Sequence, residues 1–206
     1  IMFTDIRNFT PLSERREPED VVRLLNAYFT RMVEIVFRYG GTLDKFLGDG
    51  LMAVFGVPFE QPDGPLRAVL VALEMQAALE EFNKELAISQ DMPSVKIGIG
   101  IATGPVVAGN IGSLERMEYT CIGDTVNYAA RLQGLNRDVG STILLSETTG
   151  AEVEGILPLR RTPELRVKGR QATSRPWVLN PAAIEETALE GIRRAVLGGD
   201  GAVIEG

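Results

Sequence analysis

The chain has 206 residues, a formal net charge of −7, and 45% hydrophobic and 24% charged residues, which is typical of one globular core. The acidic balance argues against nucleic acid or an anionic membrane as a partner. Histidine is absent and Cys121 is the single cysteine. These counts exclude histidine-dependent catalysis and an internal disulfide, and they fit a reducing, cytoplasmic compartment.

The first half of the chain alternates apolar strands with amphipathic helices. Pro18 in a first turn and Gly40-Gly41 beyond the last turn delimit one helix. The expected elements are a strand at 1–6, a helix at 18–39, hairpin strands at 42–47 and 51–55, a helix at 65–86 and a strand at 95–101. This order predicts an α/β (α+β) fold with a ferredoxin-like βαββαβ core.

The second half predicts further strands and helices after this core. We expect a strand at 106–111, a loop at 112–118, a helix at 125–135, and strands at 142–145, 165–167 and 175–179. We divide the chain into one domain at 1–181 and a C-terminal helix with a glycine-rich tail at 182–206. Because the chain opens at Ile1 inside an apolar run, we interpret it as a piece of a longer protein.

Two aspartates occupy positions where the backbone is expected to turn. Asp5 follows the first apolar strand, and Asp49 stands in a Gly48-Asp49-Gly50 hairpin turn. Carboxylates at neighbouring strand ends can hold Mg²⁺, which usually takes one or two protein carboxylates together with substrate phosphates. The pattern therefore indicates a nucleotide-handling enzyme that uses two metal ions.

Several segments together resemble the catalytic domain of class III nucleotidyl cyclases, over about residues 1–180. The matching segments are Phe3–Thr10, Asp44–Asp49, Gly104–Gly112, Tyr119–Arg131 and Val167–Gly169.

The resemblance implies roles for ten residues of this chain. Two Mg²⁺ ions, for which Mn²⁺ can substitute, would be held by carboxylates and one backbone carbonyl. The remaining residues would bind ATP phosphates, select the base, orient the ribose and stabilise the transition state. The metal ligands would be Asp5, Ile6 and Asp49; the phosphate-binding residues Phe9, Thr10 and Lys168; the base-selecting residues Lys45 and Thr120; and the catalytic residues Asn127 and Arg131.

The chemistry of these residue types agrees with the implied roles. Asn127 and Arg131 are four residues apart on an expected helix, so they share a face. A guanidinium presents a planar fork of donors to phosphoryl oxygens. Guanylate cyclases typically carry glutamate at the Lys45 position, whereas the lysine–threonine pair here resembles bacterial adenylate cyclases. The implied reaction is attack of the ribose 3′-hydroxyl on the α-phosphorus of ATP, giving 3′,5′-cyclic AMP and pyrophosphate.

The resemblance also implies an assembly. The metal ligands and the remaining site residues would come from different subunits of a homodimer, although Lys45 and Asp49 lie four residues apart on one hairpin. A sensor or regulatory domain is expected upstream of this chain. Two departures from the family pattern are Asn8, at a turn position that many members fill with glycine, and Pro105, where some relatives carry a basic residue.

Other interpretations remain open at this point. Each polar residue alone is more often structural: Asp49 as a turn former, Lys45 and Lys168 as surface charges. A diguanylate cyclase hairpin would read Gly-Gly-Asp/Glu-Glu-Phe, and a polymerase palm would need a basic face. A catalytically silent nucleotide-binding module would have lost a metal aspartate, the asparagine or the arginine, and all are present.

Overall fold

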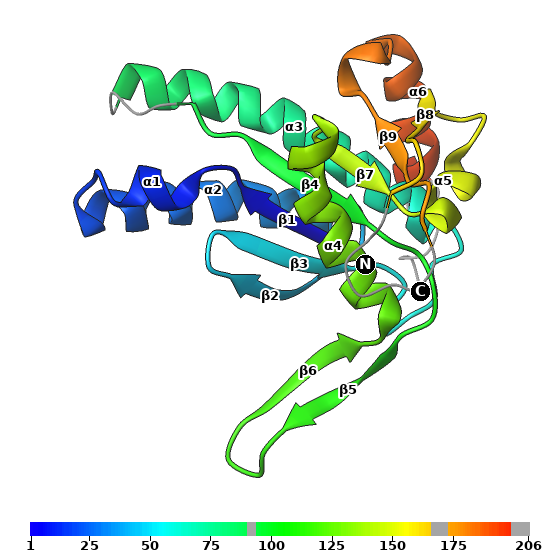
Figure 1. Ribbon diagram of the computed structural model, residues 1–206, viewed down its shortest axis with the longest axis horizontal. Coiled ribbons are helices and arrows are strands. Elements are labelled where there is room, and N and C mark those ends of the chain that lie inside the picture. The colour runs from blue at the N-terminus through cyan, green and yellow to red at the C-terminus, as the bar shows by residue number, and fades with distance from the viewer. Residues whose placement is uncertain (90–93, 166–172, 199–206) are drawn as a thin grey trace.

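A seven-stranded sheet with strand order β2-β3-β1-β4-β7-β9-β8 forms the centre of the computed structural model, which describes residues 1–89, 94–165 and 173–198. The elements in chain order (Figure 1) are β1 (Met2–Ile6), α1 (Phe9–Ser13), α2 (Pro18–Arg38), β2 (Thr42–Leu47), β3 (Gly50–Val54), α3 (Gly64–Ser89), β4 (Ile97–Ile101), β5 (Val107–Gly112), β6 (Met117–Ile122), α4 (Asp124–Val139), β7 (Ile143–Leu145), α5 (Glu147–Val153), β8 (Leu159–Arg161), β9 (Trp177–Leu179), the 3₁₀ turn η1 (Pro181–Ala183) and α6 (Glu186–Gly198).

The predicted ferredoxin-like core is confirmed. β1 lies between β3 and β4 and is antiparallel to both, and β2 completes the order β2-β3-β1-β4. The helices α2 and α3 provide the two crossovers. β7 extends this sheet because it pairs in parallel with β4.

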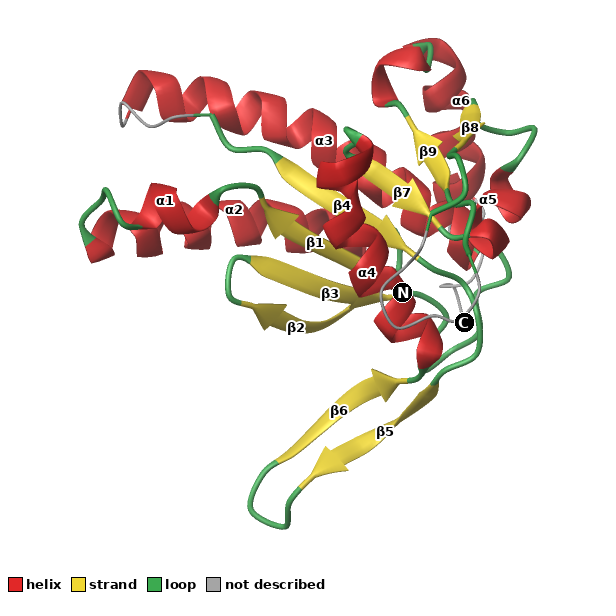
Figure 2. Ribbon diagram, in the orientation of Figure 1, coloured by secondary structure: helices red, strands yellow, loops and turns green. Residues whose placement is uncertain are grey.

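Helices cover both faces of the sheet (Figure 2). The main core joins buried side chains of α2 and α3 to one face of the strands, while α4 packs on the other face through Tyr128, Ala129 and Leu132. Gly100 on β4 permits this second contact, because a Cβ there would lie 2.2 Å from the backbone nitrogen of Gln133. Among the helices of the described residues, none has the length and hydrophobicity that a membrane span requires.

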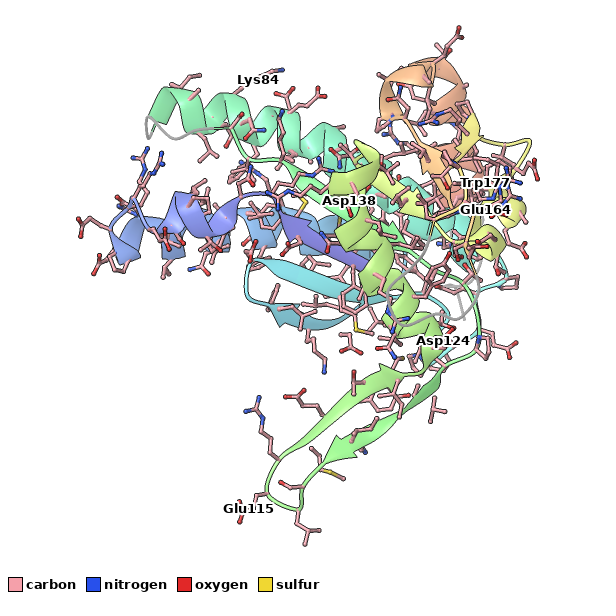
Figure 3. The ribbon with its side chains drawn as sticks, in the orientation of Figure 1. Lys84, Glu115, Asp124, Asp138, Glu164 and Trp177 are labelled. Atoms are coloured by element: carbon pink, nitrogen blue, oxygen red, sulfur yellow. The ribbon has the colours of Figure 1, made fainter. Side chains whose placement is uncertain are left out.

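The β5–β6 hairpin projects away from the sheet (Figure 1). Figure 3 places Glu115 at its far tip and Asp124 at the start of α4, where the hairpin rejoins the body. The expected loop at 112–118 is too long: β5 runs to Gly112, and β6 begins at Met117. The turn between them is closed by two backbone hydrogen bonds between Ser113 and Arg116.

The C-terminal part contains two short elements, α5 and β8, that the sequence did not predict. The strand expected at 175–179 is confirmed in shortened form as β9. Of the strand expected at 165–167, Leu165 forms an isolated bridge with Ser174, and the rest lies outside the described residues. α6 buries Leu189 and Val196 in the main core, and the tail beyond Gly198 is not among the described residues.

Candidate active site

Asp5 and Asp49 lie next to each other because β1 pairs with the hairpin that carries Asp49. Asp5 stands opposite Gly50 in the β1–β3 register, and Gly48 takes the positive φ (66°) that the tight hairpin turn requires. A Cβ at position 50 would lie 2.2 Å from the carbonyl oxygen of Thr4 and 3.3 Å from Oδ1 of Asp5. Glycine at position 50 therefore allows the strand to approach the carboxylate closely.

The two carboxyl groups repel each other as anions. Burial, then the charge of Asp49 and a side-chain hydrogen bond with it, raises the pKa of Asp5 to about 6. No group of three or more acidic, cysteine or histidine side chains suited to a metal ion occurs in the described part of the chain. The donor set is thus a pair of carboxylates, with Ile6 lining the same pocket, and carboxylate oxygens fit a hard divalent cation.

A pocket of about 1460 Å³ opens around this pair. Ile6, Phe9 and Thr10 line it together with the two aspartates, as their expected roles require. Basic side chains that the sequence did not single out also line it: Arg7, Arg15, Arg16, Lys96 and Arg137. An acidic protein therefore provides local positive charge beside its carboxylates, which suits a polyphosphate bridged by metal ions.

Asn8 shapes the turn that enters this pocket. Its φ of 57° and ψ of 34° place it in the left-handed region, where asparagine is better tolerated than most side chains. Its Oδ1 accepts a hydrogen bond from Nη2 of Arg137 at 2.9 Å, which joins the turn to α4. The departure at position 8 thus keeps the turn and adds a side-chain contact that glycine cannot make.

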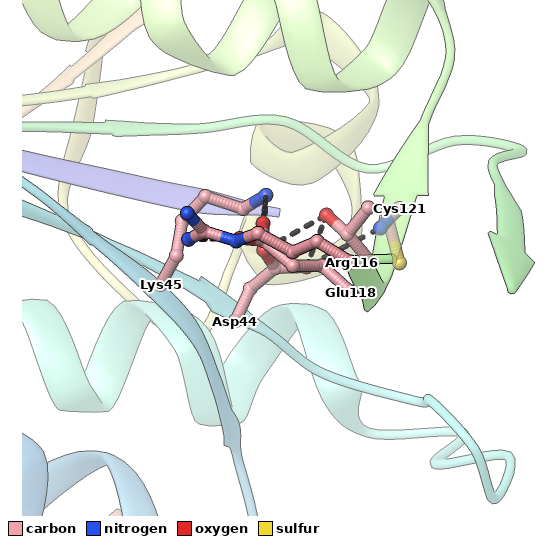
Figure 4. A network of polar contacts seen from close by, with 6 residues as sticks. Asp44, Lys45, Arg116, Glu118 and Cys121 are labelled. Carbon is pink, nitrogen blue, oxygen red and sulfur yellow. Dashed lines mark hydrogen bonds and ion pairs between the residues drawn. The ribbon is translucent and has the colours of Figure 1, made fainter. Parts of the chain in front are cut away.

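Lys45 lies beside Asp44 and Glu118, as Figure 4 shows, and Thr120 is hydrogen-bonded to the same Asp44. The Thr120 hydroxyl donates to both carboxylate oxygens of Asp44 at 2.9 Å, and Nζ of Lys45 is 3.5 Å from Oδ1 of Asp44 and 3.2 Å from Oε2 of Glu118. Burial acts to lower the pKa of Lys45, but the hydrogen bond to Glu118 and the charge of Asp44 outweigh it and raise the pKa. Asp44 therefore joins the expected base-selecting residues Lys45 and Thr120 into one polar cluster.

Asn127 and Arg131 lie in α4, four residues apart on one face, as predicted. Nη1 of Arg131 is buried without a hydrogen-bond partner among the described residues, which leaves a donor for an anion. Neither these two residues nor Lys45 and Thr120 line the pocket around Asp5 and Asp49. Lys168 lies outside the described residues. Within one chain the expected site residues therefore fall into two separate groups.

The family model for the "Adenylate and Guanylate cyclase catalytic domain" matches residues 1–180. The chain belongs to this family, and its fold is that of a class III nucleotidyl cyclase catalytic domain.

The similar proteins include some named as adenylate cyclases and some named as guanylyl cyclases. Adenylate cyclase 1 of Rhizobium meliloti (strain 1021) is 38% identical over 169 residues, 82% of this chain and 25% of that protein. The adenylyl cyclase CyaB from P. aeruginosa superposes with a TM-score of 0.82 at 33% identity, covering 87% of this chain and 91% of that one. The guanylyl cyclase Cya2 superposes at 0.78 and 36% identity, covering 86% and 89%. The chain spans about a quarter of the length of the Rhizobium meliloti protein.

Proposed function

We propose that the chain is an adenylate cyclase domain that converts ATP to 3′,5′-cyclic AMP and pyrophosphate. The observation that carries the proposal is the placement of Asp5 and Asp49 side by side, by the β1–β3 register, in one pocket that basic side chains also line. The family membership of residues 1–180 supports it.

Each group of residues has a part in this reaction. Asp5, Asp49 and the Ile6 carbonyl would hold two Mg²⁺ ions, which supply Lewis acidity and lower the pKa of a bound hydroxyl. The turn at Phe9 and Thr10 and the basic wall of the pocket hold the phosphates. Asn127 orients the ribose, and Arg131 balances the negative charge that grows on the phosphoryl oxygens. Lys168, which lies outside the described residues, is assigned to the terminal phosphates by the family resemblance alone.

Lys45 and Thr120 are proposed to choose the base. Adenine offers a 6-amino donor and an N1 acceptor, whereas guanine offers an O6 acceptor and an N1–H donor. A lysine ammonium donates only, so it matches N1 of adenine, and a hydroxyl that accepts matches the 6-amino group. The relatives include both adenylyl and guanylyl cyclases, so it is this pair that favours ATP.

The complete site is proposed to form between two copies of the chain. The separation of the two residue groups within one chain supports this arrangement. So does the β5–β6 hairpin, whose large apolar side chains are exposed: Val107, Leu114, Met117, Tyr119 and Ile122. An exposed apolar surface of this kind marks an interaction site, and a two-fold dimer would build two equivalent shared sites.

One assay tests the proposal. The purified chain is incubated with ATP or GTP and Mg²⁺ or Mn²⁺, and cyclic nucleotide and pyrophosphate are quantified. We expect cyclic AMP and pyrophosphate in equal amounts, with ATP preferred. Cyclic GMP as the main product would make the chain a guanylate cyclase, and no product from either nucleotide would favour a silent nucleotide-binding module.

A further inference from the structure

Asp44 lies at an irregularity of β2. Its side chain contacts both expected base-selecting residues, Lys45 and Thr120. The β2–β3 register pairs Leu43 with Ala53 but Lys45 with Met52, so Asp44 is the extra residue of a β-bulge. A bulge redirects side chains that would otherwise alternate between faces. Accordingly, the consecutive residues Asp44 and Lys45 both contact β6.

We propose that Asp44 is a positioning residue that makes the base site select adenine over guanine, by holding the hydroxyl proton of Thr120 on its own carboxylate. This inference rests on the proposed function, because it assigns Thr120 to the purine base. It assigns a role to Asp44 that the sequence did not suggest.

The geometry fixes the direction of the hydrogen bond. The Asp44 side chain is 4% exposed, and its two oxygens lie 2.9 Å from the Thr120 hydroxyl. Oδ2 also accepts from the backbone N–H of Cys121 at 3.2 Å (Figure 4). An ionised carboxylate only accepts, so Thr120 must be the donor. The hydroxyl has a single proton, and that proton is used here.

The direction of the hydrogen bond that Thr120 can make to the base is therefore fixed. With its proton on Asp44, the Thr120 oxygen can only accept, and it matches the amino group at position 6 of adenine. Guanine presents an oxygen there, which would face the lone pairs of Thr120. A site that leaves buried polar groups unpaired with the wrong ligand rejects that ligand strongly.

The test compares Asp44→Asn with the wild-type chain. The carboxamide keeps the size of Asp44 and an acceptor for Cys121, but its NH₂ can donate to Thr120 and release the hydroxyl proton toward guanine O6. We expect the ATP-to-GTP ratio of kcat/KM to fall by about tenfold or more. The same shift is expected in dissociation constants for 3′-deoxy-ATP and 3′-deoxy-GTP, which lack the attacking hydroxyl and bind without turnover.

A double-substitution cycle shows whether Asp44 acts through Thr120. In a Thr120→Val background, Asp44→Asn should leave the ratio unchanged, because there is no hydroxyl to direct. Asp63→Asn is the matched control: its carboxylate pairs with Arg67 at the start of α3, outside the site, and the ratio should stay at the wild-type value. If Asp44→Asn fails to fold, Thr120→Ser should keep the adenine preference and Thr120→Val should lose it.

The outcomes separate this inference from the proposed function. A wild-type chain that binds 3′-deoxy-ATP preferentially but forms no cyclic nucleotide refutes the proposed function, and the binding ratios still test Asp44. A wild-type chain without base preference overturns the role of Asp44. So does an unchanged ratio in Asp44→Asn, an equal change with and without the Thr120 hydroxyl, or equal ratios in Thr120→Ser and Thr120→Val.

Discussion

Asp5 and Asp49 lie together in the fold although their negative charges repel each other. Folding brings the two carboxyl groups together, and the raised pKa of Asp5 shows that the charged form is disfavoured there. A divalent cation would offset the repulsion of both groups. Residues with such opposed demands are typical of functional sites.

The first prediction concerns this pair. Asp5→Asn and Asp49→Asn should each lower cyclic-nucleotide formation by at least about 10³-fold, because the contribution of a bound metal ion is several kcal/mol. The melting temperature should stay equal or rise, because an amide removes the repulsion. Initial rates at saturating Mg²⁺ and thermal unfolding check both points. Near-native turnover in either variant would contradict the metal assignment.

At the scale of elements, the strongly periodic segments were predictable from the sequence. α2, α3, the β2–β3 hairpin and β4 follow from helical or alternating apolar spacing and from glycine or proline at their ends. The missed elements lack that signal. α5 has seven residues, two of them threonines and one a glycine, and β8 has three. The start of β6 is mostly exposed, so no burial pattern marks it.

The candidate residues Asp5, Asp49, Lys45 and Thr120 were singled out in the sequence because each stands in a characteristic local motif. Asp44 was not, because its role depends on a bulge and on a hydrogen bond between positions 76 residues apart. The basic side chains Arg15, Lys96 and Arg137 come from three separate segments that only the fold unites.

The second prediction tests the close contact of α4 with the sheet. Gly100→Ala should lower the free energy of unfolding by about 1–3 kcal/mol, because its Cβ would overlap backbone atoms of Gln133 and Ala129. Gly134→Ala, on α4 next to Gln133, is the matched control. Apart from the chain neighbours and the helix's own backbone, no atom lies within 4 Å of a Cβ there, and the substitution should stabilise by about 0.5–1 kcal/mol. Urea unfolding measures both, and equal effects would contradict the tight contact.

At the scale of the whole molecule, the expected site residues lie in two separate places. The carboxylates lie in the pocket beside β1, while Thr120, Asn127 and Arg131 belong to the projecting hairpin and the first half of α4. A dimer in which each hairpin reaches the partner would join the two groups. Each of its two sites would then use the carboxylates of one subunit and Arg131 of the other.

The most direct test is complementation between inactive chains. Asp5→Ala and Arg131→Ala should each be inactive alone. In their heterodimer one site collects both defects and the other is intact, so a 1:1 mixture with random pairing should recover about a quarter of wild-type activity. Asp5→Ala mixed with Asp49→Ala is the control and should recover none, because both sites then lack a carboxylate. Recovery in the first mixture alone is the predicted result, and no recovery in verified heterodimers would contradict the shared site.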